Sequence, residues 1–113
     1  MLTDEGSAGQ STTADPVAAD LLDPTFVPVR AARVARADLD GETVLWHPET
    51  GITAVLDPIG SVLWECFDGS GSIDEIAADL SAVYGVDVAT IRTDVLNLVR
   101  ELGGLGLLEG VAP

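Results

Sequence analysis

The residues best suited to do chemistry in this sequence are one histidine, His47, and one cysteine, Cys66. A general base or a metal site needs a partner histidine, cysteine or carboxylate at a defined spacing, and His47 has no such partner in the sequence. Cys66 falls beside Leu63 and Phe67 on the inner face of a predicted helix, where a cysteine behaves as a small hydrophobe. No basic neighbour in sequence would lower the pKa of its thiol. We therefore predict no catalytic residue.

Acidic residues outnumber basic ones 19 to 5, and the formal net charge is −14. The acidic segment Asp68–Glu75 invites a calcium-binding interpretation, but its ligand spacing does not match an EF-hand loop and it leads into a capped helix. The glycine-rich segment Gly103–Gly106 follows a helix, which is typical of a helix end and not of a phosphate-binding loop. The sequence thus predicts no metal and no cofactor. The negative charge would repel nucleic acid and anionic membrane surfaces.

The length of 113 residues leaves room for one small domain. Residues 1–25 are rich in Ser, Thr, Gly, Asp and Ala and have no periodic apolar face, so we predict a disordered acidic tail there and a folded domain over 26–110. A single cysteine rules out an internal disulfide and fits a reducing compartment. No signal peptide and no run of ~20 apolar residues is present, which favours a cytoplasmic location.

The first structured segment, Pro28–Leu39, is ambiguous from its residues alone. Arginines at a spacing of three and several alanines favour a helix, whereas Val29 and Val34 allow a strand equally well. Asp40-Gly41 is a strong turn signal after it. The residues leave both alternatives open for 28–39.

Two strands joined by a four-residue loop are predicted next, over 42–47 and Ile52–Leu56. The alternation in the first of them places Val44 and Trp46 on one face and Thr43, Leu45 and His47 on the other. The second strand runs directly into a helix start, because Asp57 can cap a helix and Pro58 suits its first position. A strand placed in this way has few neighbours in its own chain to hide it. We interpret Ile52–Leu56 as an edge strand that is open to a partner peptide.

Three helices follow, over 58–67, 73–84 and 88–102. The second opens with a capping box, Ser72 to Glu75, and ends at Gly85, while Asp87 caps the third. Residues at core spacing in the first two helices are Ile59, Val62, Leu63, Cys66 and Phe67, and Ile73, Ile76, Ala77, Leu80, Val83 and Tyr84. Strands followed by three helices are typical of a winged helix-turn-helix, an α+β fold.

The third helix carries more apolar surface than a core stripe needs. Beyond its central face, Leu96 and Val99 lie to one side, with Arg92 between them, and the opposite side is polar. Such an extension suits the wall of a groove or simply a wider core contact, and the pattern does not separate the two.

The order and spacing of five stretches over residues 29–109 resemble the PqqD family, the pyrroloquinoline quinone biosynthesis protein D group, also called the RiPP recognition element. These stretches are Leu45–Glu49, Val55–Asp57, Asp68-Gly69, Ser72–Ala77 and Leu105–Leu108. Asp57 departs from the family pattern, which often has Asn at this position; both residues cap helices.

The resemblance implies a three-stranded antiparallel sheet followed by three helices, with 28–39 as the first strand. It also implies a non-enzymatic protein that binds the leader segment of a ribosomally made precursor peptide and presents it to a maturation enzyme, often a radical-SAM protein. The leader would add a strand beside Ile52–Leu56 by β-augmentation. We expect the edge to be formed by Ile52, Thr53, Ala54 and Val55, and the wall by Arg92, Leu96 and Val99, with Arg92 able to pair with an acidic leader residue.

A DNA-binding winged-helix regulator is the alternative, because it shares the fold class. In a DNA reader the third helix would enter the major groove with basic or amide side chains leading. Here its first turn is Asp87 to Thr90, and only Arg92 and Arg100 are basic. The acidic surroundings outweigh them, so we expect no nucleic-acid partner.

Overall fold

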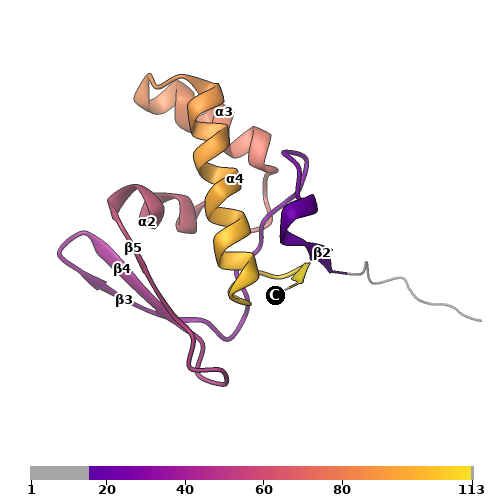
Figure 1. Cartoon of the computed structure of the whole chain (residues 1–113). Coiled ribbons are helices and arrows are strands. Elements are labelled where there is room, and N and C mark those ends of the chain that lie inside the picture. Colours follow the sequence, from indigo (N-terminus) through magenta and orange to yellow (C-terminus); the bar gives the residue numbers. More distant parts are fainter. Residues whose placement is uncertain (1–15, 113) are drawn as a thin grey trace, which may run out of the picture.

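The computed structural model describes residues 16–112, and the sheet and helices occupy the order that the sequence predicts. The strands and helices are β2 (Val17–Ala18), the 3₁₀ turn η2 (Ala19–Leu21), β3 (Ala35–Leu39), β4 (Glu42–Trp46), β5 (Thr53–Leu56), α2 (Pro58–Glu65), α3 (Ile73–Tyr84), α4 (Val88–Gly104) and β6 (Val111–Ala112). Figure 1 shows α4 running up the middle of the molecule, with the sheet on one side of it. The α+β winged helix-turn-helix class is confirmed.

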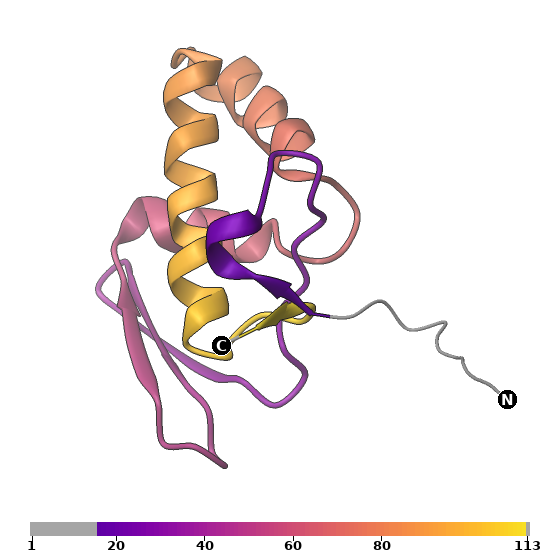
Figure 2. The same ribbon diagram turned by 45° about the vertical axis from the view of Figure 1, so that its right-hand side comes forward.

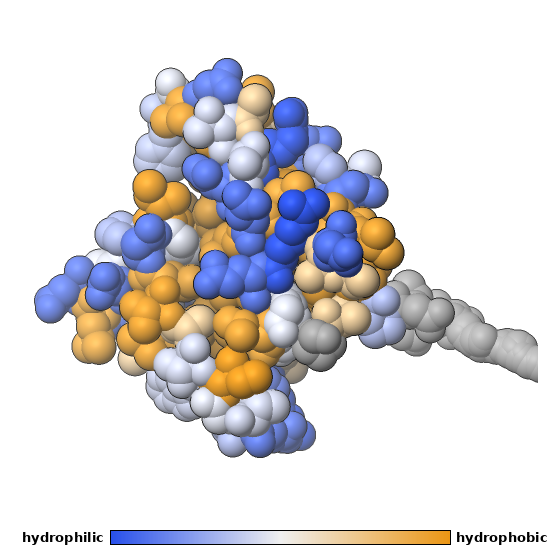
Figure 3. Space-filling view, viewed as in Figure 1, coloured by the Kyte–Doolittle hydropathy of each residue, from blue (hydrophilic) through white to orange (hydrophobic). Residues whose placement is uncertain are grey.

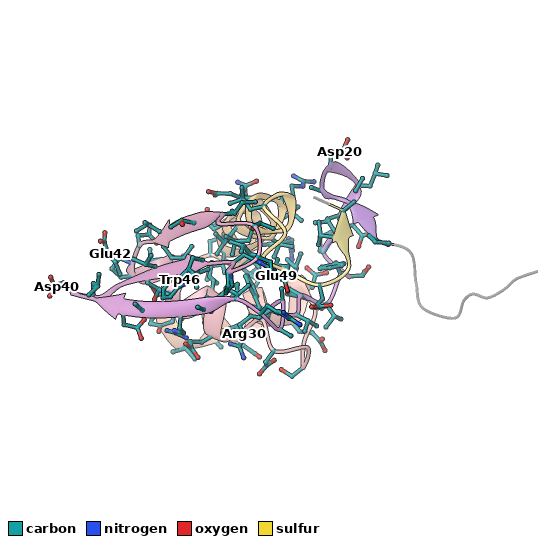
Figure 4. All side chains as sticks on the ribbon, turned by 90° about the horizontal axis from the view of Figure 1, so that it is seen from below. Asp20, Arg30, Asp40, Glu42, Trp46 and Glu49 are labelled. Carbon is teal, nitrogen blue, oxygen red and sulfur yellow. The ribbon has the colours of Figure 1, made fainter. Side chains whose placement is uncertain are left out.

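The main sheet is antiparallel with the strand order β3-β4-β5. Thr43 and Leu45 share the face toward the helices and are buried, and Val44 and Trp46 share the outer face and are half-buried. The alternation predicts these two sets of residues. Asp40 and Glu42 lie at the far end of the β3–β4 hairpin (Figure 4). The first strand is shorter than the predicted 28–39. Residues 28–31 instead lie between the segment that follows α2 and the segment that follows α4. The Arg30 N–H donates to Phe67 O at 2.9 Å, and the Ala31 N–H donates to Leu107 O at 3.0 Å.

The helix boundaries follow local signals. Asp57 accepts the N–H of Gly60 at 2.7 Å, and Ser72 and Glu75 form both bonds of the predicted capping box. Gly85 ends α3 with φ +69°, a conformation that favours glycine. The predicted third helix extends two residues further, to Gly104.

Several apolar residues assigned to the core lie at the surface. Ile59 is 68% exposed and Val62 38%, and on α3 Val83 is 72% and Tyr84 61% exposed. Trp64 is buried, and its ring makes a T-shaped contact with Phe67 at a centroid distance of 6.5 Å. The first helix ends at Glu65, two residues before the predicted end. It packs through Leu63 and Trp64, Phe67 just after it is buried in the core, and its Ile59 face points away from the core.

The N-terminal boundary of the folded domain is earlier than predicted. Residues 1–15 lie outside the described part of the chain, but 16–25, which we assigned to the disordered tail, are structured. Val17–Ala18 pairs in parallel with Val111–Ala112, and Leu22 is buried in the core at 4% exposure. The segment runs along α4 on the side away from the main sheet (Figure 2). Its apolar residues are few, but they cover a surface that α4 would otherwise expose to water.

Candidate functional site

The open edge of β5 is the feature of the main sheet that stands out. Within residues 16–112, β5 pairs only with β4. The pairing begins with His47, which donates its N–H to Ile52 O at 2.9 Å. In an antiparallel ladder such bonded pairs alternate along the strand, so Ala54 and Leu56 also turn their main-chain groups toward β4. The main-chain N–H and C=O groups of Thr53 and Val55 must then point away from β4, toward the free edge of the sheet.

Thr53 and Val55 therefore present two N–H and two C=O groups at the sheet edge. Both residues are exposed, and the Val55 side chain, at 62% exposure, lies on the outer face of the sheet. Ala54 and Leu56 point to the inner face, toward the helices. This edge can accept one further strand by main-chain hydrogen bonds alone.

A cavity of about 310 Å³ begins where β5 ends. It lies between the start of α2 and one flank of α4, and its lining includes Asp57, Ile59, Asp94, Leu98 and Glu101. Asp94, Leu98 and Glu101 follow one another at intervals of four and three residues, so they share this flank of α4, and Leu105, directly after the helix, continues the same spacing. In the space-filling view, apolar surface over α2 and β5 lies beside hydrophilic side chains over α4 (Figure 3).

The three predicted wall residues of α4 lie on the other flank. Arg92 donates from Nε to Asp74 Oδ1, at the start of α3, at 2.6 Å. Val99 is fully buried, and Leu96 is half-buried against the core. One position further round this side, Arg100 donates from Nη2 to Leu22 O at 3.4 Å. This flank faces α3 and the N-terminal segment, whereas β5 lies on the opposite side of α4 (Figure 1).

The structure thus keeps the predicted strand residues together and separates them from the predicted wall. Of the strand residues, Ile52 lies just before β5, and Thr53, Ala54 and Val55 form it. Asp94, Leu98 and Glu101 were not proposed from the sequence as wall residues. The sequence did contain an indication of this flank. Asp94 and Glu101 are seven residues apart and lie on either side of Leu98, so this side of the helix has an apolar centre and an acidic border.

The two candidates for catalytic chemistry lie apart from this cavity. The His47 ring Nδ1 accepts the N–H of Glu49 at 3.2 Å. Burial, reinforced by the nearby carboxylates of Asp68, Asp79 and Glu65, raises the pKa of the Cys66 thiol. At neutral pH Cys66 is therefore a poor nucleophile. Among residues 16–112, no group of three or more His, Cys, Asp or Glu side chains is placed to hold a metal ion.

Comparison with known proteins identifies the family. The family model described as coenzyme PQQ synthesis protein D (PqqD) matches residues 42–108. TbiB1, solved in complex with the TbiA(beta) leader peptide, is 34% identical, with a TM-score of 0.65 over 75% of this chain and 99% of that one. The PqqD truncation of Methylobacterium extorquens PqqCD, described as a functional and stand-alone RiPP recognition element, is 26% identical, with a TM-score of 0.68 over 80% and 97%. No curated protein matches the sequence.

The fold is that of a RiPP recognition element domain. The chain belongs to the PqqD family. The matched range begins at β4 and ends after α4, so it contains both β5 and the flank of α4 that faces it. None of the helices in 16–112 has the length and apolar character that a bilayer crossing requires.

Proposed function

We propose that this protein is a non-enzymatic peptide-binding module. It binds the leader segment of a ribosomally synthesised precursor peptide and presents the rest of that peptide to a modifying enzyme, such as a radical-SAM protein. The observation that supports this proposal most is the outward row of main-chain groups at Thr53 and Val55. It occurs in a chain that is 34% identical to a protein solved with a leader peptide.

The bound leader extends the sheet as a fourth strand beside β5. Main-chain hydrogen bonds set its direction and register, while its alternate side chains point inward. Those inward side chains meet the α4 flank formed by Leu98, Glu101 and Leu105, of which the two leucines are half-buried. The proposed wall is therefore this flank, in place of Arg92, Leu96 and Val99.

The second edge of the sheet, β3, suits a peptide less well. The same alternation turns the main-chain groups of Arg36 and Asp38 outward there. Their side chains form ion pairs: Arg36 with Asp38 at 2.9 Å and also with Glu65 on α2. A guest strand at this edge would have to pack beside charged groups that already have partners, and it would gain little apolar contact.

The expected affinity is modest. Four main-chain hydrogen bonds contribute about 1 kcal/mol each, and two apolar side chains add about 2 kcal/mol each. Ordering the leader costs about 2–5 kcal/mol. The net of roughly 3–6 kcal/mol corresponds to dissociation constants from millimolar to tens of micromolar.

Val55→Pro tests the proposal. The Val55 N–H is not part of the β4–β5 ladder, and an edge strand tolerates proline at such a position, so the fold should persist. The change removes one outward donor and places a ring in the path of the guest strand. We expect at least about a tenfold loss of affinity, measured by calorimetry for the TbiA(beta) leader and for peptides selected from a displayed random library on the wild-type chain.

Two matched variants separate the main-chain edge from its surroundings. Val55→Ala keeps the N–H and should change affinity by less than about threefold. Asp38→Pro removes the outward N–H at the β3 edge, together with the ion pair to Arg36 and the acceptor of the buried Thr43 hydroxyl. Circular dichroism checks that this variant is folded, and it should leave binding intact. If Asp38→Pro abolishes binding and Val55→Pro does not, the guest strand adds to β3 and the proposed site is wrong.

A further inference from the structure

An apolar cavity between α2, α3 and α4 is not used by strand addition at β5. Its volume is about 470 Å³. Its lining includes Ile59, Val62, Tyr84 and Val86, which are 68%, 38%, 61% and 44% exposed, together with the buried Leu63 and Ile91. Large apolar side chains gathered around one hollow are typical of a surface that receives an apolar group from a partner.

This cavity adjoins the smaller one at the end of β5. Ile59, Leu63 and Asp94 line both. The smaller cavity also contains Asp57, the residue directly after β5. A peptide that pairs with β5 and continues past Leu56 therefore reaches the apolar cavity after crossing the first turn of α2.

The place where such a peptide would pass from the smaller cavity to the apolar one is acidic. Asp94 borders both cavities, and Asp57 and Glu101 line the smaller one. All five basic residues of the chain are engaged elsewhere: Arg30 with Glu65, Arg33 with Glu49, Arg36 with Asp38 and Glu65, Arg92 with Asp74, and Arg100 with Leu22 O. None of these arginines lines either cavity. A positive charge at this point must come from the occupant.

We propose that the peptide bound at β5 has a second recognition element just beyond its strand segment. It consists of a lysine or arginine that faces Asp94 and Glu101, next to a large apolar residue that fills the cavity between α2, α3 and α4. This inference rests on the proposed function, because the peptide is brought there by β5. A concave cavity that continues from a strand edge suits a single side chain of an extended peptide better than the flat face of a globular partner.

The probe is a displayed library of random peptides of about twelve residues, long enough for a strand segment of about five and its continuation. The library is selected on the full wild-type chain, and selected peptides are then sorted by their loss of binding to Val55→Pro. Among peptides that depend on Val55, we expect an aromatic or large aliphatic residue beside a lysine or arginine, at a fixed distance from the strand segment.

The acidic contact is tested with two double variants of equal charge change. Asp94→Asn with Glu101→Gln should weaken the selected basic peptides about tenfold at low salt, and less at high salt. Asp40→Asn with Glu42→Gln, at the far tip of the hairpin (Figure 4), should change affinity by less than about twofold. A peptide whose basic residue is replaced by glutamine should no longer distinguish the first double variant from the wild type.

The apolar contact is tested with Ile59→Ser, whose exposed side chain makes a folding defect small. It should weaken the selected peptides about tenfold and leave unchanged any peptide whose large apolar residue is replaced by alanine.

Three outcomes would overturn the inference. Selected peptides that depend on Val55 but have no basic residue and bind all variants equally would refute it and leave the proposed function standing. Self-association of the chain that Ile59→Ser abolishes would assign the cavity to a second copy. If no selected peptide depends on Val55, the proposed function fails, and the inference fails with it.

Discussion

Asp57 has two effects at the junction of β5 and α2. Its Oδ1 accepts the Gly60 N–H at 2.7 Å, which satisfies one of the main-chain donors left over at a helix start. Its carboxylate also adds negative charge to the cavity at the end of the proposed guest strand. An asparagine at this position would keep the cap and lose the charge. If the proposed function holds, we expect the charge of Asp57 to bear on which peptide is bound and not on the fold.

Leu22 shows how one buried side chain sets the domain boundary. It is 4% exposed, whereas its neighbour Leu21 is 71% exposed. We expect Leu22→Ala to lower the free energy of unfolding by about 2–4 kcal/mol, because it leaves a cavity beside α4. The measurement is urea denaturation of the full chain.

Leu21→Ala is the control for Leu22→Ala, since it removes the same atoms from an exposed position. It should change the free energy of unfolding by less than about 0.5 kcal/mol. Equal and small effects of the two substitutions would mean that the residues before 26 do not belong to the folded domain.

At the scale of elements, α4 separates two surfaces of different character. Its Arg92 and Arg100 side faces α3 and the N-terminal segment, and its Asp94, Leu98 and Glu101 side faces α2 and β5. The N-terminal segment covers the apolar residues of the first side. Only the side of α4 with Asp94, Leu98 and Glu101 is left for a peptide strand that binds beside β5.

The C-terminal turn of α4 is packed closely against β6. A Cβ added at Gly103 would lie 2.4 Å from Val111 Cγ1. We expect Gly103→Ala to displace β6 and lower the free energy of unfolding by about 1–3 kcal/mol, with a matching drop in the melting temperature. Thermal unfolding followed by circular dichroism measures this.

Gly104 provides the matched control for Gly103, because nothing lies within 4 Å of a Cβ added there. As Gly104 is the last residue of α4, Gly104→Ala should be neutral or stabilise the protein by up to about 1 kcal/mol. A destabilisation equal to that of Gly103→Ala would show that the contact with Val111 does not explain the first result, because helix propensity favours alanine over glycine at both positions.

At the scale of the whole molecule, charge distinguishes the peptide-binding proposal from a DNA-binding winged helix. The net charge is −14, and every arginine is held by a carboxylate or a main-chain carbonyl. The gain from counterion release that drives DNA binding requires basic groups free to meet phosphates. The arrangement therefore opposes nucleic acid as a partner.

We expect no shift of duplex DNA in a gel at low salt, the condition that favours any electrostatic binding most. A basic winged-helix regulator of similar size serves as the positive control. A shift by this chain that disappears as salt rises would contradict the proposal and restore the DNA-binding alternative.

Much of the fold could be predicted because its signals are local. The capping box at Ser72–Glu75, the cap at Asp57 and the alternation of Thr43 and Leu45 each involve residues within a few positions of one another. Such signals determine where helices and strands begin and which side chains share a face of a strand. The open edge of β5 could be expected as well, because the chain after Leu56 runs directly into three predicted helices. These leave no predicted strand that could pair with the free edge.

Which flank of α4 faces β5 was decided only by the tertiary structure. The periodicity of the helix places Leu96 and Val99 on one side and Asp94 and Glu101 on the other, but it does not say what covers either side. The cover of the first side is Val17–Leu22, a segment too short to show a periodic pattern by itself. Its burial depends on contacts with residues nearly eighty positions away, such as that between Leu22 and Arg100, and no local rule in the sequence contains them.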